Sequence, residues 1–129
     1  MQKNYIMFGC LMAALAVVLG AFGAHALKVR LSPDQLATFE TGVKYQFYHA
    51  FAILFAALLL DKHQHAFINY AIYAFSAGIL CFSGSIYLLA TRNLIGLTTY
   101  KWLGPITPIG GTFFIVAWIL LFLAVLAQK

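Results

Sequence analysis

The sequence is poor in charged residues. Only 9% of its 129 residues are Asp, Glu, Lys or Arg, whereas a soluble domain carries about 25%. Hydrophobic residues make up 64% of the chain. A chain of this composition cannot fold as a water-soluble globule, because it has too few polar side chains to cover a surface. The composition predicts an integral membrane protein, with membrane lipids as its partners and no nucleic acid.

Acidic residues and cysteines are also scarce. The only carboxylates are Asp34, Glu40 and Asp61, and all three fall outside the apolar spans predicted below. No set of nucleophile, base and carboxylate is available, and glycine-rich phosphate loops and metal motifs are absent. Cys10 and Cys81 lie inside apolar runs and are expected to pack as small apolar side chains. We therefore predict that the protein is not an enzyme and has no cofactor and no metal site.

Four apolar runs lie between islands of charged residues. Each is long enough to cross a hydrocarbon core, which needs about 20 helical residues. The predicted spans are residues 5–27, 43–60, 67–90 and 106–127. They predict an all-α integral membrane protein, a single membrane domain built as an antiparallel bundle of four transmembrane helices.

The first run has a second interpretation. Lys3 precedes it and Ala24-His25-Ala26 imitates the cleavage site of a secretory leader. The run is longer than the usual leader core of about 7–15 residues, so we favour a retained span. Small residues recur along it and would let a neighbouring helix approach closely: Gly9, Ala13, Ala16, Gly20 and Ala24.

The second helix is predicted to begin before its span. In "SPDQ", Ser32 is a good N-cap, Pro33 suits the first helical position and Gln35 completes a capping box. The first part of this helix, residues 33–44, is amphipathic and is expected to lie at the membrane interface, with a bend at Gly42 before the span.

The fourth helix is predicted to begin within "TPIGG". Thr107 would be the cap and Pro108 the first helical residue, followed by the pair Gly110-Gly111. Free backbone N–H groups and the positive end of the helix dipole would then favour an anionic group.

Lysine and arginine are distributed unequally between the two ends of the predicted bundle. The first and third loops hold five of them and the opposite side holds three. Basic loops tend to face the cytoplasm. We therefore expect a bacterial inner-membrane protein with both termini outside.

Polar and small residues from all four spans are predicted to share one half of the bilayer, because each group lies beside the first or the third loop. Such side chains are costly at membrane depth unless they face the bundle interior, and they form a functional hypothesis by default. We predict that they line a pocket for a polar or anionic amphiphile, such as a lipid headgroup or a quinone. The predicted binding residues are His25, Tyr45, Gln46, His49, Ser83, Ser85, Thr107, Gly110 and Gly111.

Other interpretations remain open. Interhelical hydrogen bonds could simply hold the bundle together, at about 0.6 kcal/mol each. His25 and His49 could ligate a haem iron if the helices bring them together, and Asp61 with His63 and His65 could form a weak zinc or copper site. The chain could instead be a homo-oligomer, or a structural subunit or assembly factor of a larger membrane complex. Transport is disfavoured, because four spans leave little room for alternating access.

Four stretches carry a resemblance to a known family. "GAFGAHAL", "TGVKYQFYHA", "FSGSIYLL" and "ITPIGG" resemble the signature blocks of the small bacterial inner-membrane family catalogued as domain of unknown function 423, which has a small eukaryotic transmembrane relative. The resemblance covers the whole chain and implies a four-span membrane protein of about this length. It implies no activity, substrate or residue role.

Overall fold

The computed structural model describes all 129 residues, and every regular element in it is helical. Four rods are long and apolar enough to cross a membrane: Gln2–Leu27, Pro33–Lys62, Ala66–Ala90 and Leu103–Leu126. The predicted all-α, four-span architecture is therefore confirmed. Two of the rods contain a π-helical turn, so the elements are α1 (Gln2–Phe22), η1 (Gly23–Leu27), α2 (Pro33–Lys62), α3 (Ala66–Gly78), η2 (Ile79–Ser83), α4 (Gly84–Ala90) and α5 (Leu103–Leu126).

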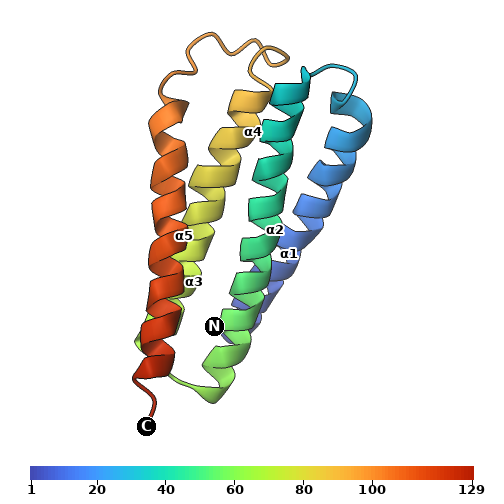
Figure 1. The fold of residues 1–129 in the computed structure, drawn as a ribbon. Coiled ribbons are helices and arrows are strands. Elements are labelled where there is room, and N and C mark those ends of the chain that lie inside the picture. Colours follow the sequence, from blue (N-terminus) through green and yellow to red (C-terminus); the bar gives the residue numbers. More distant parts are fainter.

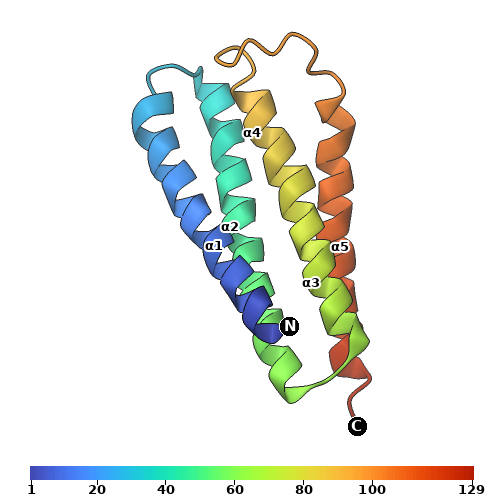
Figure 2. The same ribbon diagram turned by 180° about the vertical axis from the view of Figure 1, so that it is seen from behind.

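The rods run antiparallel to one another (Figures 1 and 2). Both termini and the connection 63–65 lie at one end, which we call the termini end. The connections 28–32 and 91–102 lie at the opposite end, with Lys28, Arg30, Arg92 and Lys101. We call this the basic end, and divide the molecule into a termini half and a basic half. At the basic end the rods stand in the order α1, α2, α4, α5 in both views.

The termini half contains the main apolar core. Fourteen buried residues form it, contributed by α2, α3, η2 and α5. Alanines on the inner face of α2 let the neighbouring helices approach closely, which is how helices associate in lipid. The core residues are Ala52, Ile53, Ala56, Ala57, Leu60, Ile68, Ala71, Ile72, Phe75, Ile79, Phe114, Ala117, Leu121 and Ala124.

The basic half contains a much smaller apolar core. Only four buried residues form it: Leu27, Leu31, Phe39 and Ala90. Phe39 packs on the Tyr87 ring at a centroid distance of 5.1 Å. Between this small core and the termini end, small residues of α1 let the first and second rods pack closely. A Cβ added at Gly9 would lie 2.7 Å from Leu54 Cδ2, and Ala16 has no exposed surface.

The start of α2 follows the prediction closely. Ser32 is the N-cap and Pro33 the first helical residue. Ser32 Oγ accepts a hydrogen bond from the Gln35 backbone N–H at 3.2 Å, and Gln35 Oε1 accepts one from the Ser32 N–H at 3.1 Å. The helix then continues through Gly42 to Lys62 without interruption. No break in the helix therefore occurs at Gly42.

The predicted start of the fourth helix was wrong. The helix begins four residues before Thr107, at Leu103, and Pro108 lies inside it. An earlier start is possible because Pro105 falls in the first turn, where a missing N–H breaks no helical hydrogen bond. Thr107 is therefore not a cap. Gly110 and Gly111 lie in the helix interior rather than in its first turn, so the argument for free N–H groups at these glycines fails.

The two π-helical turns were not predicted. η1 falls in the "GAFGAHAL" stretch and η2 contains the first two residues of "FSGS". η2 lies inside its rod, and single π-helical turns inside α-helices are rare and occur frequently at functional sites. η1 ends the first rod, where a π-turn is an ordinary way for a helix to finish. Both turns lie next to the polar groups of the predicted site, which makes the basic half the place to examine for function.

Candidate functional site

Three of the four predicted stretches meet in the basic half. Ser83 Oγ donates a hydrogen bond to the Gly42 carbonyl oxygen at 2.7 Å, which joins η2 to α2. The Tyr45 and Phe82 rings lie 4.8 Å apart. The Ser85 and Thr107 hydroxyls share a hydrogen bond of 2.6 Å that joins α4 to α5. The expectation that these stretches share one depth is consistent with these contacts.

Gln46 is the centre of a buried polar cluster. Its Nε2 donates to the Met12 carbonyl oxygen on α1 at 2.9 Å. Its Oε1 accepts a hydrogen bond from the Tyr87 hydroxyl on α4 at 2.6 Å. Gln46 is 3% exposed and Ser83 has no exposed surface. Each polar atom of these two side chains has a hydrogen-bond partner within the protein, so the side chains join helices.

The same conclusion holds for the hydroxyl pair and the first glycine. Ser85 is buried and also donates to the Phe82 carbonyl oxygen at 3.0 Å. Gly110 is buried, and a Cβ added there would overlap the backbone of Phe82. Five of the nine predicted residues therefore build helix contacts: Gln46, Ser83, Ser85, Thr107 and Gly110.

His49 is held by the protein on both ring nitrogens. Its Nδ1 lies 2.7 Å from the Tyr45 carbonyl oxygen. A carbonyl can only accept, so Nδ1 carries the proton and donates. Nε2 is then an acceptor, and it receives the Trp118 Nε1–H at 3.3 Å. The ring also stacks on Phe114, with centroids 3.6 Å apart and planes 5° from parallel.

His25 does not join the other predicted residues. It lies in η1 with an exposed side chain, and lines neither of the two largest cavities described below. The prediction that His25 lies near the first loop is consistent with its place in η1. Its side chain, however, does not face the other predicted residues. A haem held between His25 and His49 does not fit this arrangement, because both His49 nitrogens are already bonded to the protein.

The two histidines near the termini end are turn residues. His65 is the N-cap of α3, where its Nδ1 accepts a hydrogen bond from the Phe67 N–H at 3.1 Å. No group of three or more His, Cys, Asp or Glu side chains is assembled to hold a metal ion.

One large cavity is an open groove beside His49, which we call the His49 groove. Its volume is about 480 Å³. Tyr45, His49 and Gly111, all predicted site residues, line it. Its other lining residues, which the sequence did not single out, are Phe82, Pro108, Thr112, Phe114, Ile115 and Trp118. Trp118 could have been noticed in the sequence. Tryptophan favours the membrane interface, but Trp118 lies near the middle of its predicted span, where a polar indole N–H needs a partner.

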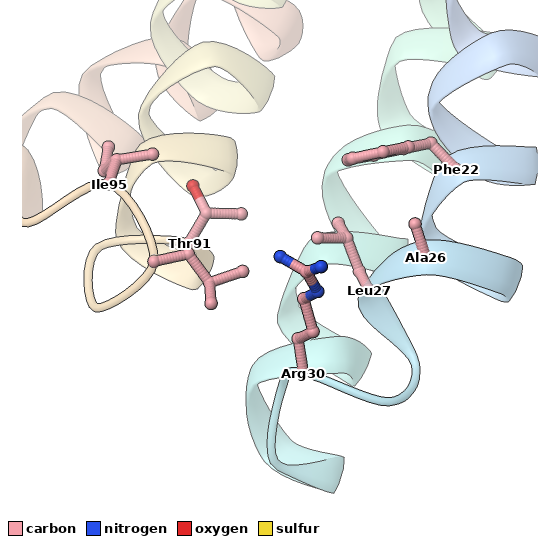
Figure 3. Close-up of a pocket in the computed structure, with 7 residues that line it drawn as sticks. Phe22, Ala26, Leu27, Arg30, Thr91 and Ile95 are labelled. Carbon is pink, nitrogen blue, oxygen red and sulfur yellow. The ribbon is translucent and has the colours of Figure 1, made fainter.

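The other large cavity lies at the basic end, between η1 and the segment that follows α4 (Figure 3). We call it the Arg30 pocket. Its volume is about 420 Å³ and its walls are apolar apart from two side chains, Arg30 and Thr91. Figure 3 shows the Arg30 guanidinium extending into the gap between Leu27 and Thr91. The apolar walls are Phe22, Ala26, Leu27, Leu94 and Ile95.

The guanidinium of Arg30 is free, unlike that of the other arginine at this end. Arg92 donates to the Leu89 carbonyl oxygen at 2.7 Å and lies over the Tyr100 ring, 4.9 Å from its centroid. Arg30 is exposed and donates no hydrogen bond to another residue. The sequence predicts that Arg30 lies in the basic first loop. It contains no signal that the end of the first rod and residues 91–95 enclose a cavity.

Comparisons with known proteins agree with this architecture. A family model described as "Protein of unknown function (DUF423)" matches residues 19–111. This chain belongs to that family. A UPF0382 membrane protein of Staphylococcus aureus (strain bovine RF122 / ET3-1) is 42% identical over 123 residues, which cover 95% of each chain. The UPF0382 membrane protein YwdK of Bacillus subtilis is 40% identical over 124 residues, covering 95% of this chain and 96% of YwdK.

A third relative, a UPF0382 membrane protein of Staphylococcus haemolyticus, is 36% identical over 123 residues, or 95% of each chain. No solved structure matches the chain significantly. The family match encloses all nine predicted site residues and the whole lining of the Arg30 pocket. The chain is thus a membrane protein of a bacterial family whose function is unknown.

Proposed function

We propose that this membrane protein binds an anionic phospholipid in the Arg30 pocket. The phosphate of the headgroup lies at the Arg30 guanidinium, and an acyl chain lies against the apolar walls. The protein acts as a binding protein and not as an enzyme. The observation that carries the proposal is a guanidinium with no partner in the chain at the mouth of an apolar cavity.

The chemistry of the pocket matches both parts of such a lipid. Guanidinium presents its N–H donors in a planar fork that fits phosphate oxygens, and such charge-assisted bonds are stronger than neutral ones. Phe22, Leu27 and Ile95 offer only carbon surface to the remainder of the ligand. A free phosphate ion would use the first feature and leave the second without a role, which favours a lipid.

The position of the pocket supports the same ligand. It lies at the basic end, whose connections carry four of the eight lysines and arginines, with Lys44 further along α2. We place this end at the cytoplasmic face of the inner membrane, by the tendency of basic loops to remain inside. Anionic lipids give that surface a negative potential that attracts basic segments.

Two other functions are less well supported. A structural subunit or assembly factor would need a free surface on which a partner helix could pack, such as the small residues of the first span. Gly9 and Ala16 instead pack against α2 within the chain, so they offer no free surface to a partner. Binding at the predicted nine-residue pocket is also less favoured, since Gln46 and Ser83 have their hydrogen bonds satisfied internally.

The test is lipid retention by the purified full-length protein in mild detergent, measured by native mass spectrometry. Phosphatidylglycerol should be retained over phosphatidylcholine with the same acyl chains. Inorganic phosphate at about 10 mM, roughly ten times the upper end of common KM values, should not displace it. Arg30→Gln should weaken phosphatidylglycerol binding about tenfold or more, because hydrogen bonds to charged groups contribute about 1.5–3 kcal/mol.

Lys101→Gln is the matched control, since Lys101 is an exposed cation at the same end that does not line the pocket. Its effect should be less than about twofold, as expected for a screened surface charge. Ala26→Phe, which fills the pocket without changing the charge, should also release the lipid. Equal losses in Arg30→Gln and Lys101→Gln, or equal retention of the two lipids, would contradict the proposal.

A further inference from the structure

We propose that the His49 groove is a second site, which binds the ring of a membrane quinone. This inference goes beyond the lipid site, because the groove is lined by different residues and carries no charged side chain. It rests on three features of the groove: the absence of charge, one free hydrogen-bond donor, and aromatic walls.

The groove excludes charged ligands by its composition. No Lys, Arg, Asp or Glu lines it. His49 could supply charge only by taking a second proton on Nε2, and that atom already accepts the Trp118 indole N–H. A phosphate or carboxylate would lack a cation there, and an amine would lack an anion. The ligand is therefore neutral.

The free donor in the groove is the Tyr45 hydroxyl. The Tyr45 carbonyl oxygen accepts the His49 Nδ1–H, but the phenol hydroxyl makes no hydrogen bond within the chain. The other hydroxyl in the groove, that of Thr112, donates to the Pro108 carbonyl oxygen at 2.9 Å. Tyr45 is 39% exposed, and within a membrane span an exposed hydroxyl meets hydrocarbon instead of water, which is costly without a partner. A ligand with a carbonyl oxygen would accept the hydrogen bond that Tyr45 has available.

The walls of the groove suit a flat ring. Tyr45, Phe82 and Phe114 form a group of tilted rings, with centroids 4.8 Å apart for Tyr45–Phe82 and 5.5 Å for Phe82–Phe114. Aromatic faces and edges attract another ring at such distances. Gly111 lines the groove without a side chain, which leaves room on α5. The volume of about 480 Å³ falls within the range of small-molecule pockets, about 300–1,000 Å³.

The experiment uses tryptophan fluorescence of the full chain in mild detergent. The chain has two tryptophans, so Trp102→Phe leaves Trp118, which lines the groove, as the only emitter. A short-chain ubiquinone is the probe. Binding in the groove predicts saturable quenching of Trp118, whereas quinone dissolved in the detergent predicts quenching that rises without saturation.

Two matched variants identify the donor. In the Trp102→Phe background, Tyr45→Phe removes the free hydroxyl and should raise the apparent Kd roughly fivefold, the value expected for one hydrogen bond. Tyr48→Phe removes an exposed hydroxyl of the same helix that does not line the groove, and should leave the Kd unchanged. Gly111→Leu should abolish saturation by filling the groove, with circular dichroism confirming that the variant is folded.

Three outcomes would overturn the inference: quenching without saturation, equal Kd values for the two tyrosine variants, or unchanged quenching in a folded Gly111→Leu variant. Phosphatidylglycerol retention is measured on the same samples. If the Trp102→Phe protein without a groove substitution retains phosphatidylglycerol but binds no quinone, the groove alone is refuted. If it binds quinone but does not retain the lipid, the Arg30 pocket alone is refuted.

Discussion

The termini half and the basic half of the molecule are built from the same four rods but packed in different ways. In the termini half, fourteen buried apolar residues form a continuous core. In the basic half, only four apolar residues do so, and the buried polar side chains Gln46, His49, Ser83 and Ser85 take their place beside two π-helical turns. The Arg30 pocket also lies there. The His49 groove lies where the two halves meet, since Phe114 of the main core is among its lining residues.

This difference separates stability from candidate function. Close packing of small and apolar residues is what holds helices together in lipid, where no hydrophobic force acts between them. Interhelical hydrogen bonds add about 0.6 kcal/mol each, so the polar half is held together more weakly. It is also the half in which groups such as the Arg30 guanidinium and the Tyr45 hydroxyl are left available to a ligand.

The largest expected effect is a loss of stability from the termini half. Ile72→Ala removes a side chain that is 1% exposed in the main core, and should lower the free energy of unfolding by about 3 kcal/mol through the cavity it leaves. Unfolding in mixed detergents, followed by circular dichroism, measures it. Ile119→Ala, at a half-exposed position on α5, is the control and should cost much less. If the folded Ile72→Ala protein lost lipid binding, the claim that the termini half serves stability and not ligand binding would be contradicted.

A smaller effect is expected where α5 approaches η2. Gly110→Ala places a methyl group onto the backbone of Phe82, and rigid backbone cannot move aside as a flexible side chain would. We expect a loss of about 2 kcal/mol, typical of overpacking, measured by the same unfolding assay. Gly104→Ala on the same helix meets nothing within 4 Å and should be neutral. Equal stability of the two variants would show that the helices are not in close contact at Gly110.

The smallest expected effect concerns the polar cluster. Gln46→Leu and Tyr87→Phe each remove one side of the 2.6 Å hydrogen bond between α2 and α4. Their double-mutant cycle should give a coupling energy of about 0.6 kcal/mol, the average for such bonds in membranes. Gln46→Leu with Tyr70→Phe, whose ring is exposed on α3, should give none. A coupling of several kcal/mol would mean that the basic half is not the weaker one.

The helices could be predicted because their causes are local. Long apolar runs, the Ser32–Gln35 capping box and Pro33 each act within a few residues, and each is present as expected. The start of α5 could not be predicted in this way. Thr107 and Pro108 have the residue types of a helix start, but the Thr107 hydroxyl bonds Ser85 on another helix, and a partner so far along the chain leaves no local signal.

The sequence predicts how far along its helix each candidate site residue lies, but not the direction in which its side chain points. Counting residues from the loops placed Tyr45, Ser83 and Thr107 near one another. The direction of each side chain depends on the turns that precede it, and the π-helical turns change that direction. His25 lies within one such turn and is exposed. Arg30 lies in a loop, where helical periodicity says nothing about the cavity beside it.

The π-helical turn at Ile79–Ser83 determines how the third rod would respond to the deletion of one residue. Such a turn holds one residue more than an α-helical turn, so deleting a single residue there would restore an ordinary helix and leave the residues on either side facing as they do now. Ser85 and Tyr87 would then keep Thr107 and Gln46 as partners. Deleting Gly84, which follows the turn, would instead remove a residue from a regular helix, rotate the rest of the rod by about 100° and carry both side chains away from these partners. The same one-residue deletion would thus be absorbed at one position and would disrupt the helix contacts at the next.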